Sequence, residues 1–169
     1  PIFIVQHMPP LFTRMLAERL SACSSIPVEE GSQGREVTPG TAYIAPGGFH
    51  MVVERIGGVV RLAVNTDPPE NSCRPAVDVL FRSVAQVYGP GVLGVVLTGM
   101  GHDGRLGSER IVGAGGLVVV QDAASSVVPS MPLSVAENGF ADAVLPLDNV
   151  AAEIATRVAR GRTSREPFA

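Results

Sequence analysis

The chain is poor in aromatic residues, in cysteine and in excess charge of either sign. Aromatic residues make up 5% of the sequence, and there is no Trp. The net charge of −3 provides no basic surface for nucleic acid or for an anionic membrane. Cys23 and Cys73 lie far apart and match no metal-binding or redox spacing, so we expect reduced thiols in a cytoplasmic protein. No apolar run reaches the length that spans a membrane, so we expect no membrane insertion.

What is present is an alternation of apolar, β-branched runs with segments of helical periodicity. A length of 169 residues suits one domain. Strands are predicted over 2–5, 26–29, 41–45, 51–54, 59–64, 94–98, 116–121 and 141–146, and helices over 10–22, 75–88, 104–113, 131–138 and 147–160. This order predicts a three-layer α/β fold with a mostly parallel, doubly wound sheet. The segments at 51–64, separated by a glycine-rich turn, predict a β-hairpin excursion from it.

Two short motifs place titratable residues directly after apolar runs. His7 follows the run 2–5, and Asp103 follows the run 94–98. Parallel strands deliver side chains to one edge of an open sheet, where a histidine and an aspartate form two members of a hydrolytic triad. Two structural alternatives remain open. His7 is also suited to capping a helix or bonding a loop, and Asp103 to capping the helix that follows it.

The glycines before and after Asp103 have two interpretations. Gly99, Gly101 and Gly104 let backbone amides approach an anion or a developing oxyanion. The same spacing resembles a dinucleotide fingerprint, for which Asp122 is the acidic residue at about the expected distance.

The remaining histidines do not predict a metal centre. His50 begins a predicted hairpin strand, and His102 lies in a glycine-rich loop. Neither forms an i, i+4 pair with another ligand, so we expect no metal.

Several motifs in series resemble the catalytic domain of the chemotaxis protein-glutamate methylesterases (CheB type). The resemblance extends over almost the whole chain, in order. The motifs are QHMPP (6–10), AYIAPG (42–47), HM (50–51), RPAVDVLF (74–81), LTGMGHDG (97–104), QDAASSVV (121–128) and MP (131–132).

The resemblance implies a serine hydrolase without a cofactor. Its substrates would be methyl esters on glutamyl side chains of methyl-accepting chemotaxis receptors, and members of the family often also deamidate glutamines. His7 would be the general base and Asp103 the residue that orients it, while the backbone amide of Met100 would contribute to the oxyanion hole. Residues 1–161 would form the catalytic domain and 162–169 a C-terminal tail. A receiver domain would be a partner if the parent chain carries one.

The sequence departs from the family pattern in two places. The nucleophilic serine of the family lies in a Gly-x-Ser-x-Gly-Gly turn upstream of the histidine, and residues 1–6 contain no serine. Because Pro1 leads directly into an apolar run, we expect a fragment that lacks the first βα unit. The alternatives are a catalytically silent relative that binds receptors and, less favoured, a nucleotide-binding α/β domain. Pro129-Ser130 also replaces an aromatic residue and a glycine, which affects the pocket rim.

Overall fold

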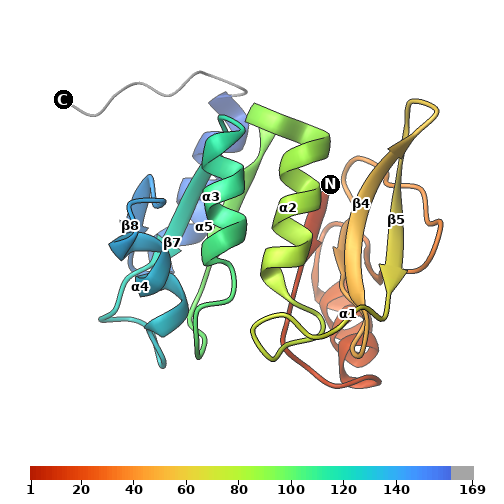
Figure 1. Ribbon diagram of the computed structural model, residues 1–169, viewed down its shortest axis with the longest axis horizontal. Helices are drawn as coiled ribbons and strands as arrows, with labels where there is room; N and C mark the ends of the chain where they lie inside the picture. The colour runs from red at the N-terminus through yellow and green to blue at the C-terminus, as the bar shows by residue number, and fades with distance from the viewer. Residues whose placement is uncertain (161–169) are drawn as a thin grey trace. The chain divides into compact units, whose positions relative to one another are not determined.

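The computed structural model describes residues 1–160, which divide between two compact units (Figure 1). The first unit is Pro1–Ser83, and the second begins at Val84. The predicted tail at 162–169, and Gly161 at the end of the predicted catalytic domain, lie outside the described residues. No helix within residues 1–160 has the length and apolar character needed to cross a membrane.

The first unit contains a parallel sheet with the strand order β1-β3-β2. The strands are β1 (Ile2–Ile4), β2 (Val28–Glu30) and β3 (Ala42–Ile44), and helix α1 (Phe12–Cys23) packs on them. One apolar stripe of α1 faces the sheet, because its small and aliphatic residues recur at helical spacing. The core of this unit contains Ala17, Val28, Ala42 and Ile44, with Leu16 and Leu20 packed against it.

An antiparallel hairpin follows, as the sequence predicts. Strands β4 (His50–Ile56) and β5 (Val59–Asn65) pair along their whole length. Gly57 and Gly58 connect them with φ values of 58° and 84°. Two consecutive positive φ angles are typical of the type I′ turn, whose twist matches that of the flanking strands. Helix α2 (Val77–Tyr88) then begins in the first unit and ends in the second.

The second unit contains another parallel sheet, with the order β6-β7-β8. Its strands are β6 (Leu93–Val96), β7 (Leu117–Gln121) and β8 (Ala143–Leu145). Helices α3 (Arg105–Gly113), α4 (Ser130–Glu137) and α5 (Leu147–Arg160) each contact β7, with α3 in front of that strand and α5 behind it in Figure 1. The all-valine centre of β7 is fully buried, which is typical of a parallel strand covered on both faces.

The parallel α/β architecture and the hairpin are therefore confirmed, while several strand ends differ from their predictions, most notably that of β6. The sequence predicts a central strand over 94–98, whereas β6 ends at Val96 and pairs only with β7 among residues 1–160. Thr98 leaves the strand because its amide donates to the Gln121 side chain (2.8 Å) and its hydroxyl bonds Val128.

Candidate active site

His7 lies in a loop that follows β1 and packs closely on the loop after β3. The Ala45 amide donates to the Ile4 carbonyl (2.8 Å), which extends the sheet by one bond. A Cβ on Gly47 would overlap the backbone of Pro9 and Pro10, so only glycine lets the two loops approach this closely. His7 does not cap α1, because the N-cap residue of that helix is Leu11 and it makes no side-chain cap bond.

Thr13 connects three elements beneath this loop. Its side chain is fully buried, accepts a hydrogen bond from the Gly47 amide (2.9 Å) and donates one to Glu30 (2.6 Å). The first turn of α1 is thereby tied to the ends of β2 and β3. A buried hydroxyl with both hydrogen-bond partners satisfied favours one arrangement of these loops, so the loop that carries His7 is held in place.

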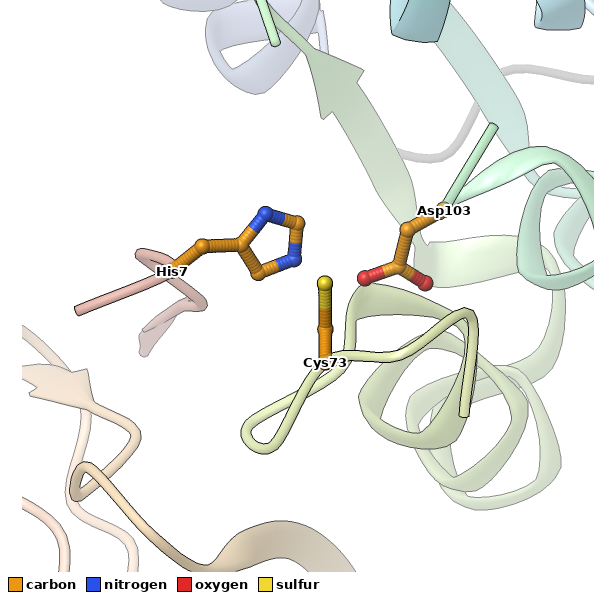
Figure 2. Close-up of side chains that lie close together, drawn as sticks. All are labelled: His7, Cys73 and Asp103. Atoms are coloured by element: carbon orange, nitrogen blue, oxygen red, sulfur yellow. The ribbon is translucent and has the colours of Figure 1, made fainter. Parts of the chain in front are cut away.

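The side chain of His7 opens onto a hollow of about 280 Å³. The hollow is lined by His7, Met8, Pro9, Pro10, Gly48, Ser72, Cys73, Arg74 and Pro75. A ring nitrogen of His7 and the Sγ atom of Cys73 lie within 4.8 Å of one another (Figure 2). No local spacing in the sequence predicts this pair, because long-range folding brings the two residues together.

A tight turn holds Cys73 in place. Glu70 and Cys73 exchange two backbone hydrogen bonds (3.1 and 2.9 Å), and the two residues between them have φ values of 52° and 62°. Both terminal nitrogens of Arg82 donate hydrogen bonds to the Glu70 carboxylate (2.6 Å each). The Asn71 side chain donates a hydrogen bond to the buried Asp78 carboxylate (2.9 Å). The bidentate ion pair and the buried amide–carboxylate bond fix the turn on helix α2.

In the second unit, Asp103 is almost completely buried, with 1% of its surface exposed. Its Oδ1 accepts a hydrogen bond from the adjacent Gly104 amide (3.0 Å). Gly104, at a φ of 95°, is the N-cap residue of α3. The Asp103 carboxylate thus accepts an amide at the start of that helix, although Asp103 is not itself the N-cap residue. A buried carboxylate in a glycine-rich turn is typical of functional sites.

The turn before Asp103 presents the Met100 amide between two anchored neighbours. The Gly99 amide donates to Val128 (2.9 Å) and the Gly101 amide to the Ser130 hydroxyl (3.0 Å), which itself donates to the Gly99 carbonyl. Within residues 1–160 the Met100 amide has no hydrogen-bond partner. An anchored turn with an available donor is suited to stabilising an oxyanion. Ser130, one of the two residues that depart from the family pattern, therefore stabilises this turn through its hydrogen bonds to Gly99 and Gly101.

The CheB methylesterase family matches residues 1–154 of this sequence. The chain belongs to that family. It is 56% identical over 158 residues to a protein-glutamate methylesterase/protein-glutamine glutaminase of Trichodesmium erythraeum, covering 94% of this chain and 45% of that protein. A relative with the same description from Nocardioides is 50% identical, with coverages of 99% and 46%. The chain thus spans less than half the length of these curated relatives.

The fold agrees with that of a solved CheB domain. The crystal structure of the Thermotoga maritima CheB methylesterase catalytic domain matches with a TM-score of 0.89 and 42% identity, covering 92% of this chain and 82% of that one. The predicted fold class and family resemblance are both confirmed by these matches.

In this CheB-family chain, the Asp122 carboxylate stabilises the loop in which it lies. Its carboxylate accepts hydrogen bonds from the Ser125 amide (2.8 Å) and hydroxyl (2.6 Å), and these bonds lower the pKa of Asp122 below its ordinary value. The same Ser125 hydroxyl accepts a bond from Leu147 at the start of α5. This use of the carboxylate disfavours the dinucleotide interpretation, which requires an acidic side chain directed at a ribose.

The two other histidines, His50 and His102, are not part of the candidate active site. His50 is buried, and its Nε2 lies 3.1 Å from the Pro68 carbonyl, so it supports the loop that leads toward Cys73. His102 is exposed, and its backbone carbonyl accepts a bond from Arg105. Both positions agree with the loop and hairpin roles that the sequence predicts.

Proposed function

We propose that this chain is the histidine- and aspartate-bearing part of a protein-glutamate methylesterase. Its substrates would be glutamyl methyl esters on methyl-accepting chemotaxis receptors in the cytoplasm, and glutamine side chains would be deamidated at the same site. The observation that carries the proposal is the solvent-accessible imidazole of His7 on a rigid loop at an open hollow. The names of the relatives, which include both activities, support it.

The chemistry assigns one role to each residue. His7 accepts the proton of the serine hydroxyl as the oxygen attacks the ester carbonyl, and it then returns the proton to the departing methanol. Asp103 orients the imidazole and stabilises the imidazolium. The Met100 amide donates to the oxyanion of the tetrahedral intermediate. Water, activated by His7, then hydrolyses the acyl-enzyme and releases glutamate.

We propose that the nucleophilic serine comes from a part of the protein outside these 169 residues. Residues 1–6 contain no serine, and the relatives are more than twice as long as the stretch they share with the chain. The edge of strand β1 that is unpaired in the described part of the chain is a further argument for an additional strand outside these 169 residues. The strand pairs only with β3 among residues 1–160, and its apolar Ile2 is 50% exposed. An apolar edge of a parallel sheet is normally covered by another strand.

Residues 1–161 would act as one catalytic domain, with 162–169 as a tail. A receiver domain elsewhere in the protein would regulate it, in keeping with the greater length of the relatives. A receptor-binding relative without catalysis is the second candidate.

The test measures methanol release from methylated receptor membranes by the full-length protein. His7→Ala and Asp103→Asn should each lower the turnover by roughly 10³-fold or more, since the base is lost or held in the wrong tautomer. Ser72→Ala is the matched control, because Ser72 lines the same hollow without a role in the mechanism. Its turnover should equal that of the wild type, and melting curves should show all three variants folded.

Two results would contradict the proposal. Unchanged release in His7→Ala would remove His7 as the base. Receptor binding without any methanol release by the wild type would favour the silent relative instead.

A further inference from the structure

We propose that His7 and Cys73 form a binding site for a soft divalent cation such as Zn²⁺, and that the bound cation prevents His7 from acting as a base. Binding itself follows from the geometry of the two side chains. Only the inhibitory effect rests on the proposed function.

The separation of the two ligand atoms suits one shared ion. A ring nitrogen of His7 and Cys73 Sγ lie within 4.8 Å of each other. Zinc binds histidine nitrogen at about 2.0–2.1 Å and thiolate sulfur at about 2.3 Å, so a small side-chain rotation brings both into its coordination shell.

The surroundings favour ion binding over a chance approach of two side chains. The Glu70–Cys73 turn, gripped by Arg82, holds the thiol, and the Thr13 network holds the loop that carries His7. The ligands are therefore placed before the ion arrives, which lowers the entropic cost of binding. The hollow of about 280 Å³ leaves room for several waters to complete the coordination, at roughly 30 Å³ each.

The donor set selects the class of cation. Thiolate and imidazole favour zinc and other soft or borderline ions, whereas magnesium and calcium prefer oxygen ligands. Binding releases the thiol proton to solvent and involves no oxidation. A ring nitrogen occupied by the cation cannot accept the proton of a serine, and the added positive charge opposes the imidazolium that the reaction requires. Bound zinc would therefore inhibit ester hydrolysis.

The first experiment uses Co²⁺ as a spectroscopic probe on the reduced, full-length protein. Thiolate ligation should produce a near-ultraviolet charge-transfer band that added Zn²⁺ removes. Cys73→Ser should abolish the band, and His7→Gln should weaken Co²⁺ affinity at least tenfold. Cys23→Ser is the matched control, because Cys23 is the other thiol and lies exposed at the end of α1. The band should persist there unchanged.

The second experiment adds Zn²⁺ to the methanol-release assay. Wild type and Cys23→Ser should be inhibited, whereas Cys73→Ser, measured relative to its own turnover without Zn²⁺, should resist Zn²⁺ at least tenfold better. The proposed site would be overturned by the absence of a cobalt band or by a band that persists in Cys73→Ser. It would also be overturned if His7→Gln left the Co²⁺ affinity unchanged. If no variant releases methanol, the proposed function fails, and the cobalt titration still decides whether the ion binds.

Discussion

Asp122 shows how a single side chain can organise a loop beside a candidate site. The carboxylate accepts two hydrogen bonds from Ser125, and the Ser126 hydroxyl donates to the Asp122 backbone carbonyl (2.6 Å). The segment leads to Val128, whose carbonyl accepts a hydrogen bond from the Gly99 amide in the turn that carries Met100. A charge-assisted bond at Asp122 therefore supports the turn that carries Met100.

Removing the Ser125 hydroxyl should raise the pKa of Asp122. The hydroxyl bond is the largest cause of the lowered pKa, and the backbone bond remains in Ser125→Ala. A carboxyl whose pKa is lowered by folding adds stability that is full above its unfolded pKa and is lost as the pH falls through the folded pKa. In Ser125→Ala this loss should be smaller and should be complete at higher pH, because the folded pKa lies closer to the ordinary value.

Carbon-detected NMR titration of the Asp122 carboxyl measures both pKa values. Ser126→Ala is the control, since Ser126 bonds the backbone carbonyl of Asp122 rather than its carboxylate. The pKa of Asp122 should be unchanged in that variant. Equal pKa values in wild type and Ser125→Ala would mean that the hydroxyl does not stabilise the ionised carboxyl.

At the scale of elements, local chemistry made most strands and helices predictable. Gly57-Gly58 predicts the hairpin because only glycine readily adopts both positive φ angles. Strand β6 was predicted two residues too long at its end, because an apolar run does not reveal that the Gln121 side chain captures the Thr98 amide. The position of Cys73 beside His7 depends on the Glu70–Cys73 turn and on how it packs, and no local pattern encodes that.

The turn at 98–101 leaves room for a side chain at Gly99 only if the Met131 side chain moves. A Cβ there would overlap the Met131 sulfur in the first turn of α4. Gly99→Ala should therefore destabilise the protein by about 1–3 kcal/mol through overpacking and should also lower turnover by shifting the Met100 amide. Urea denaturation and the methanol assay measure the two effects.

Gly113→Ala is the matched control for that substitution. Gly113 is the last residue of α3, and an added Cβ meets nothing within 4 Å. Alanine there should leave turnover unchanged and raise stability by up to about 0.5–1 kcal/mol, because helical glycine costs more backbone entropy. If both variants have the stability of the wild type, close packing of Gly99 on Met131 does not constrain the turn.

At the scale of the whole molecule, each unit contains one parallel sheet, and within residues 1–160 that sheet has an apolar edge strand. In the first unit that strand is β1, and in the second it is β6. His7 follows the first of these strands, and the LTGMGHDG turn follows the second. Residues placed after the carboxyl ends of parallel strands are where open α/β sheets bind ligands. Under the proposed function, these segments would carry the general base, the orienting carboxylate and the oxyanion donor, and the nucleophile would come from another part of the protein.

The 169-residue chain expressed alone should release no methanol above the buffer rate, whereas the full-length protein should do so. The reason is that an imidazole without a serine to deprotonate cannot form the acyl-enzyme. Intact mass of the native protein provides the accompanying measurement, and we expect a value well above the 17.6 kDa of this sequence. A chain that folds alone and still hydrolyses the ester would place the nucleophile among its own residues. Ser72 and Cys73 would then be the first to replace, because both line the hollow next to His7.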